Sequence, residues 1–315
     1  MMLKHTKNRH AFTMIELVFV IIIMGIIGKF GVEFLAQTYK SFIYSSINNK
    51  LQSNSATAVE FVSTRLQRRI KASTIARETN ASIPKQFTLL ADYYKATAPI
   101  LEWIGVDTEG FRGKSLPYWS GIIDLNSSVS TTNKLHSPAT DTSKIDALIK
   151  ILANDTTSGM SDAAIYFVNP DALASADGWG WDANTTAFDL QSNVQIHPVK
   201  IGANVNDFVP VKSNGVANNF DGVDAYEFYQ LAWSAYAVGI DDWNATKGSG
   251  TLTMWYNYQP WKGERYTDGD TATVMDSVSS FRFIASDSVV KIQVCVKSDL
   301  VKNEEYSICK EKTVF

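Results

Sequence analysis

The sequence predicts an α+β fold in which a long N-terminal helix packs on a C-terminal antiparallel β-sheet, with a large irregular insertion between them. Three patterns lead to this prediction. Apolar residues dominate positions 12–32, apolar side chains then recur at helical spacing as far as Ile70, and the last third alternates apolar and polar residues. A chain of 315 residues with 45% hydrophobic content is long enough to bury one large core or two smaller ones.

The first element is an apolar segment with basic residues before it. Lys4, Lys7 and Arg9 precede it without an acidic residue among them, a charge bias that keeps the N-terminus cytoplasmic. Positions 12–32 come close to the ~20 residues that a membrane helix needs. Glu16 lies inside this segment, where an acidic side chain costs roughly 2.5–3.5 kcal/mol near the helix centre, so it calls for a functional explanation.

Two common kinds of apolar N-terminal segment fit less well. A secretory signal peptide ends in a small-residue cleavage site after the apolar run, and Gly28-Lys29-Phe30-Gly31 is a poor site of that kind. An uncleaved signal anchor gives no reason for Glu16. The run Ala11-Phe12-Thr13-Met14-Ile15-Glu16-Leu17 instead resembles the prepilin cleavage and methylation motif of type IV pilins and type II secretion pseudopilins.

The resemblance implies a pathway of processing and assembly. A prepilin peptidase would cut between Ala11 and Phe12 and methylate the new amino group of Phe12, although the family usually has glycine where this chain has Ala11. Glu16 lies one helical turn past Phe12, so the amine of a neighbouring subunit could compensate its charge in a filament. The implied partners are the prepilin peptidase, other pilin or pseudopilin subunits, an inner-membrane assembly platform and the lipid bilayer.

The same resemblance implies a division of the chain and a location. Residues 1–11 would be a leader, 12–32 the transmembrane and assembly half of the helix, 33–74 its periplasmic half, and 75–315 a globular head. The protein would cross the inner membrane once, with a cytoplasmic N-terminus and a periplasmic head, and would join a filament.

The helix is expected to continue well beyond the membrane. Apolar residues recur at helical spacing and no proline precedes Pro84, which predicts one helix of about 60 residues. The recurring residues are Ile47, Leu51, Val59, Val62, Leu66 and Ile70. Basic residues follow at the end of the helix, where they fit its negative pole better than they fit an arginine-based binding site. They are Arg65, Arg68, Arg69 and Lys71.

Regular elements are few until the last third of the chain. Asn80 to Ser161 is irregular and polar, apart from a short helix expected at Lys144–Leu152. We expect an amphipathic helix at Ala225–Val238 and a strand at Thr251–Tyr258. Phe281 to Val296 alternates apolar and polar residues on both sides of a Ser-Asp-Ser turn, which predicts an antiparallel hairpin that resembles the closing sheet of J-type minor pseudopilins.

The cysteines indicate an oxidising compartment. Cys295 and Cys309 are the only cysteines and flank 13 residues. They either form one disulfide, worth about 3 kcal/mol on the chain-entropy model, or are two unrelated buried thiols. Pilins often carry a C-terminal disulfide loop, so the resemblance favours the disulfide.

Four windows share the pattern acid-x-Asn-x-Ser/Thr, which resembles the extended acceptor of bacterial oligosaccharyltransferases. On the order of 0.3 such windows is expected by chance, although ordinary polar loops would also explain the pattern. The candidate glycosylation positions are Asn80, Asn126, Asn184 and Asn244.

No catalytic or cofactor motif occurs in the chain. Serine-hydrolase, P-loop, dinucleotide and zinc-protease patterns are missing and the histidines are scattered, so we expect no enzyme, cofactor or metal site. Asp268-Gly269-Asp270 lacks the other acids of a calcium loop and is interpreted as a turn. The eight tryptophans are interpreted as core residues, except that Trp179-Gly180-Trp181 has the context of an exposed contact patch. A net charge of −3 predicts no nucleic-acid partner.

These patterns favour a non-enzymatic minor pilin-like subunit of a type II secretion pseudopilus or a type IV pilus. Glu16 argues against a tip subunit of the K type, which characteristically lacks this glutamate. The alternative from another class is a membrane-anchored periplasmic carbohydrate-binding or hydrolytic protein that uses the tryptophans and a pair of carboxylates.

Overall fold

The structure, a computed structural model, describes residues 13–78, 87–90, 99–168, 177–181, 191–286, 289–298 and 307–315. The chain divides into two compact units, residues 1–51 and 52–315, and each is described by itself. Helix α1 (Met14–Leu66) contributes to both units. The expected α+β class is confirmed, because the long N-terminal helix packs on antiparallel β-sheet and the middle of the chain is largely irregular.

The last turns of α1 bury one face in the second unit. The buried residues there repeat every three or four positions and are Ser55, Ala58, Val59, Val62, Ser63 and Leu66. The predicted helical spacing of apolar residues is therefore confirmed at Val59, Val62 and Leu66. On the exposed side, Lys312 Nζ of strand β13 (Ser307–Val314) pairs with Glu60 Oε2 at 2.5 Å.

The helix ends at Leu66, earlier than the expected boundary at residue 74. After the helix the backbone pairs with the end of the segment Ile100–Ile104, where Ile70 N donates to Ile104 O at 2.9 Å. The guanidinium of Arg69 donates to the carbonyl oxygen of Leu66 at 2.7 Å and so satisfies one of the free carbonyls at the helix end.

Eight strands form one antiparallel sheet in the order β13-β12-β11-β10-β9-β3-β1-β2. Besides β13 they are β1 (Ile75–Arg77), β2 (Phe87–Leu89), β3 (Ile100–Ile104), β9 (Ala235–Asn244), β10 (Ser249–Tyr258), β11 (Asp270–Ser286) and β12 (Val289–Lys297). The strand expected at Thr251–Tyr258 is confirmed as β10. The expected C-terminal hairpin is confirmed as β11 and β12, with Phe281 opposite Val294 and Phe283 opposite Ile292.

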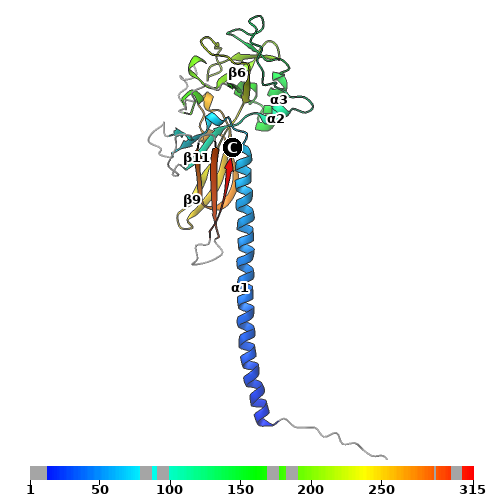
Figure 1. Cartoon of the computed structure of the whole chain (residues 1–315), viewed down its shortest axis with the longest axis vertical. Helices are drawn as coiled ribbons and strands as arrows, with labels where there is room; N and C mark the ends of the chain where they lie inside the picture. Colours follow the sequence, from blue (N-terminus) through cyan, green and yellow to red (C-terminus); the bar gives the residue numbers. More distant parts are fainter. Residues whose placement is uncertain are drawn as a thin grey trace, which may run out of the picture. The chain divides into compact units, whose positions relative to one another are not determined.

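The middle of the chain forms a second antiparallel sheet that the sequence did not predict. Its strands, in the order β4-β7-β6-β5-β8, are short. They are β4 (Leu135–His136), β7 (Asp207–Pro210), β6 (His197–Ile201), β5 (Ala164–Phe167) and β8 (Tyr229–Ala232). In Figure 1, β6 and the helices α2 (Thr108–Arg112) and α3 (Thr142–Ala153) gather at one end of the long strands β9 and β11. Helix α3 confirms the short helix expected at Lys144–Leu152.

The helix expected at Ala225–Val238 is wrong, because this segment contributes β8 and the start of β9. Leu231 pairs with Ile165 in one sheet, and Val238 pairs with Leu101 in the other. A short stretch of apolar and aromatic residues satisfies helical and strand periods alike, and pairing with two sheets decides between them here.

Among the described residues, one cluster of buried side chains lies beside each sheet. The first contains Trp179 and Trp181, which are 0% and 3% exposed, so the exposed patch expected at Trp179-Gly180-Trp181 is wrong. Trp179 packs on Tyr166 with ring centroids 5.1 Å apart. The prediction of exposure relied on the glycine and the polar loop residues around the two tryptophans. It failed because the free energy gained by burying two indole rings outweighs the polarity of their neighbours.

Candidate functional site

Among the described residues, α1 is the one helix that is long and apolar enough to span a membrane. Its apolar side chains from Met14 to Phe42 are exposed, as at Ile21 (64%) and Phe30 (66%), and an apolar surface this extensive marks a contact with lipid or protein. The nine Leu, Ile, Val and Phe residues between Leu17 and Gly28 favour insertion by about 3–5 kcal/mol in total. This sum exceeds or matches the roughly 2.5–3.5 kcal/mol that one acidic residue costs even at the bilayer centre.

The expected assembly residue Glu16 lies in the first turn of α1. Its Oε2 accepts from the Thr13 backbone N–H at 3.5 Å and from the Thr13 hydroxyl at 3.4 Å. The first contact is one half of a capping box, and Thr13-Met14-Ile15-Glu16 has the Thr-x-x-Glu pattern of that motif. Interpreting Glu16 only as an assembly residue overlooks this signal, because the carboxylate also caps its own helix. The expected processing positions Ala11 and Phe12 lie outside the described residues.

The expected disulfide between Cys295 and Cys309 is confirmed, with an S–S distance of 2.03 Å. The two residues are direct partners in the pairing of β12 with β13. The bond therefore fixes β13 covalently to the sheet in a single register.

Two of the four candidate glycosylation positions lie in the described part of the chain, and both are exposed. At Asn126, Asp124 Oδ1 accepts from the Asn126 backbone N–H at 2.9 Å. Asn126 Oδ1 in turn accepts from the backbone N–H of Ser128 at 3.0 Å and from its hydroxyl at 2.8 Å. The acid-x-Asn-x-Ser pattern at this position therefore forms two consecutive Asx turns. Turn formation alone is sufficient to explain the pattern here.

The second described position, Asn244, has a different local structure. It ends strand β9, and its Oδ1 accepts from the backbone N–H of Lys247 at 3.0 Å in the turn toward β10. The Asx-turn explanation found at Asn126 does not extend to this position. Asn80 and Asn184 lie outside the described residues.

The arginines at the end of α1 have different environments. Arg69 is buried against the helix end, and burial lowers its pKa. Arg68 Nη1 pairs with Glu109 Oε1 at 3.2 Å. The guanidinium carbon of Arg65 lies 5.6 Å from the ring centroid of Tyr236. The expected interaction with the negative C-terminal end of the helix therefore applies to Arg69. Arg65 and Arg68 face the β-sheet side of the head.

A buried ion pair lies inside the eight-stranded sheet. The side chain of Arg77 donates to the carboxylate of Glu102, which is fully buried on β3, and the Tyr258 hydroxyl donates to Glu102 Oε2 at 3.1 Å. Burial alone lowers the pKa of Arg77, but the adjacent Glu102 carboxylate outweighs it and raises this pKa. Burial and the same carboxylate raise the pKa of Tyr258. The triad joins three strands, because each of its residues belongs to a different one.

Two further ionisable groups are buried beside the five-stranded sheet. Burial raises the pKa of Asp107 to about 6, although its carboxylate accepts from Gly110 N at 3.0 Å and from Trp119 Nε1 at 3.1 Å. Burial lowers the pKa of His197 to about 3. The Nδ1 of His197 lies 2.7 Å from Gln191 Oε1, so the neutral ring donates its proton to this amide oxygen.

The carboxylates of Asp268-Gly269-Asp270 are engaged in local hydrogen bonds. Asp268 Oδ2 accepts from the backbone N–H of Arg265 at 2.8 Å, and Asp270 Oδ2 accepts from Asn257 Nδ2 at 2.9 Å. Within the described ranges, His, Cys, Asp and Glu side chains form no group of three that could hold a metal ion.

No protein-family model, curated protein sequence or solved structure matches this chain. The fold and the features above define a chain with one long apolar N-terminal helix whose end packs on a β-sheet head closed by a disulfide.

Proposed function

We propose that this chain is a minor pilin-like subunit of a type II secretion pseudopilus or a type IV pilus, processed by a prepilin peptidase and assembled through its N-terminal helix. The observation that carries the proposal is the motif from Ala11 to Leu17, which leads directly into the one helix of the described residues that is long and apolar enough to span a membrane. The order of helix and β-sheet head is compatible with a pilin-like fold.

In this proposal the N-terminal residues have separate roles. Cleavage between Ala11 and Phe12 frees the amine of Phe12 and leaves α1 attached to the head. Before assembly, Glu16 caps its own helix through Thr13. During assembly its carboxylate compensates the positive Phe12 amine of a neighbouring subunit in the low-dielectric membrane. The head would lie in the periplasm, where the Cys295–Cys309 disulfide is stable.

The rival function as a carbohydrate-binding or hydrolytic protein receives less support from the head. An aromatic platform needs exposed rings, and seven of the eight tryptophans are buried. Trp243 alone is largely exposed, at 52%.

The processing step is tested by the intact mass and N-terminal sequence of the chain extracted from membranes of its native host. We expect an N-methyl-Phe12 terminus in the parent strain and a Met1 terminus in a strain without prepilin peptidase. A Met1 terminus in both strains would rule out the prepilin pathway and favour a signal-anchored protein.

The assembly step is tested by Glu16→Gln, because glutamine also serves in a capping box and the change therefore removes charge while keeping the cap. We expect normal processing and a loss of about tenfold in the amount recovered with sheared filaments, the equivalent of about 1.4 kcal/mol. Glu33→Gln is the matched control, since Glu33 lies on the same helix and makes only an exposed 4.0 Å contact with Lys29. Equal amounts of the two variants in the sheared filaments would contradict an assembly role of Glu16.

A further inference from the structure

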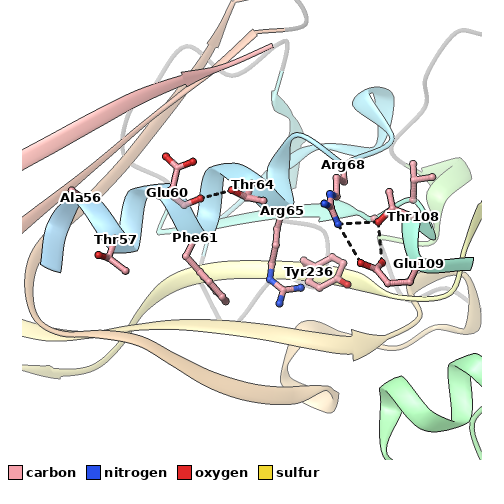
Figure 2. A pocket seen from close by; sticks show the side chains of 12 residues that line it. Ala56, Thr57, Glu60, Phe61, Thr64, Arg65, Arg68, Thr108, Glu109 and Tyr236 are labelled. Atoms are coloured by element: carbon pink, nitrogen blue, oxygen red, sulfur yellow. Dashed lines mark hydrogen bonds and ion pairs between the residues drawn. The ribbon is translucent and has the colours of Figure 1, made fainter. Parts of the chain in front are cut away.

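A groove of about 740 Å³ runs between the end of α1 and the eight-stranded sheet, where β9 begins and β3 ends. Figure 2 shows the side chains of Phe61 and Arg65 leaving the helix on the same side, with Arg65 reaching the ring of Tyr236 of β9. The opposite wall continues through the segment Gly105–Glu109, which follows β3. All these residues belong to the second unit of the chain.

Arg65 contacts two aromatic rings in this groove. Its guanidinium carbon lies 5.0 Å from the ring centroid of Phe61 and 5.6 Å from that of Tyr236. Contacts of this kind are favourable, because the negative face of an aromatic ring attracts the cation. The guanidinium carries five N–H donors in its plane, which can bind an acceptor.

The acidic residues of the groove already have partners. Glu60 pairs with Lys312 at 2.5 Å, and Glu109 pairs with Arg68 at 3.2 Å. No carboxylate in the described ranges pairs with Arg65. The groove thus presents one positive charge that no carboxylate of the described residues compensates, and a planar carboxylate is the acceptor that matches its donor geometry.

The aromatic wall beside Arg65 is structurally fixed. Tyr236 stacks on Trp103 with ring centroids 5.9 Å apart and an interplanar angle of 21°. A Cβ at Gly105 would lie 2.5 Å from the Tyr236 ring, so only glycine at this position lets the ring lie against the backbone. A preformed wall of this kind lowers the entropy cost of binding.

The dimensions of the groove favour a peptide over a small molecule. The helical wall from Ala56 to Arg65 spans about 14 Å at 1.5 Å per residue. An extended chain covers that length with about four residues. The lining is also more apolar than polar, and Phe61, Val106 and Tyr236 are its large apolar and aromatic residues.

We infer that this groove binds an extended segment of another protein, in which an Asp or Glu pairs with Arg65 and a neighbouring apolar side chain packs against Phe61 and Tyr236. This inference does not depend on the proposed function, because it concerns the head and is measured whether or not Phe12 is processed.

The test uses the full chain in detergent and a heptapeptide library displayed on phage. We expect selection to enrich peptides with an acidic residue beside an aliphatic or aromatic one. Synthetic copies of the selected peptides should bind about tenfold more weakly to Arg65→Gln than to wild type. Replacing the acidic residue of the peptide by its amide should lower the affinity for wild type by the same factor. The two changes together should cost no more than either one alone, because they remove the same pair.

Controls separate the pair from general charge effects and from misfolding. Arg282→Gln removes an exposed arginine on β11, away from the groove, and should leave peptide affinity unchanged. Arg65→Lys keeps the charge without the planar fork and should fall between wild type and Arg65→Gln. Unchanged near-ultraviolet circular dichroism would show that each variant is folded.

Three outcomes would overturn the inference. They are the absence of peptides that distinguish wild type from Arg65→Gln, enrichment of neutral peptides only, and displacement of the peptide by free succinate at the peptide's own concentration. The last outcome would identify a site for small carboxylates instead of a protein segment.

Discussion

The two sheets of the head accommodate buried ionisable groups in different ways. In the eight-stranded sheet, the buried carboxylate of Glu102 has a positive partner in Arg77 and a hydroxyl donor in Tyr258. Beside the five-stranded sheet, Asp107 and His197 are buried with hydrogen bonds but with no opposite charge among the described side chains. The first arrangement should contribute to stability at every moderate pH, whereas each group of the second should make stability depend on pH, in opposite directions.

The largest expected effect follows from removing the partner of Arg77. Glu102→Gln leaves a buried guanidinium without its counter-charge, and we expect the free energy of unfolding to fall by about 3–5 kcal/mol. The measurement is urea unfolding of the full chain in detergent, followed by tryptophan fluorescence. Glu109→Gln is the control, because its pair with Arg68 is exposed and should be worth only about 0–1 kcal/mol. Equal losses in the two variants would contradict a special role for the buried pair.

A second effect in the same sheet concerns its covalent link. Replacing both Cys295 and Cys309 by alanine should lower the free energy of unfolding by about 3 kcal/mol, because the unfolded chain regains the entropy of the open loop. The same urea titration measures it. A reducing agent should weaken the wild type by a similar amount and leave the double variant unchanged. Insensitivity of the wild type to reduction would count against the disulfide as a stabilising element.

The five-stranded sheet is tested through pH. Asp107 has a folded pKa of about 6 against an ordinary 3.8, so its contribution to stability is complete below about pH 4 and declines as the pH rises toward 6. His197 has a folded pKa of about 3 against an ordinary 6.5, so its contribution is complete above about pH 6.5 and declines as the pH falls. Between about pH 4 and 6 the two slopes, each about 1.4 kcal/mol per pH unit, should cancel.

Single substitutions should expose each slope. Relative to wild type, Asp107→Asn should lose about 3 kcal/mol of stability as the pH falls from 6 to 4, and His197→Asn should gain a similar amount. The midpoints of urea unfolding, measured for wild type and both variants between pH 4 and 6, test this prediction. Comparing slopes with wild type cancels both the constant cost of each substitution and the titration of other groups. Parallel pH profiles for all three proteins would mean that neither group has a shifted pKa.

The smallest effects concern the two exposed asparagines, one beside each sheet. Asn126→Gln and Asn244→Gln each disturb a side-chain acceptor in a turn and should cost about 0.5–1.5 kcal/mol or less. Peptide mass spectrometry of the chain from its native host tests modification at the same positions. Added mass at Asn244 would favour the glycan interpretation, because the Asx turns that explain the pattern at Asn126 are not found there. Unmodified peptides at both positions would leave turn formation as the explanation.

Prediction from sequence succeeded where a long element carried one clear period. The hairpin of β11 and β12 alternates apolar and polar residues, β10 is rich in threonine and aromatic residues, and the buried face of α1 repeats at helical spacing. The five-stranded sheet has strands of two to five residues, too short for a period to be read, and its partners are distant in sequence. The groove at Arg65 escaped prediction for a related reason, because it requires Tyr236, which lies 171 residues away along the chain.

Strand β13 has a further consequence for the solubility of the chain. Among the described strands it lies at one edge of the larger sheet, and it presents Lys310, Glu311 and Lys312, charged residues that oppose the addition of a foreign strand. Its inner neighbour β12, with the sequence Val-Val-Lys-Ile-Gln-Val-Cys-Val-Lys, has the composition of an aggregation-prone strand. A chain in which β13 detached would offer that strand as the new edge. By fixing β13 in place, the disulfide therefore protects the protein from uncontrolled self-association as well as from unfolding.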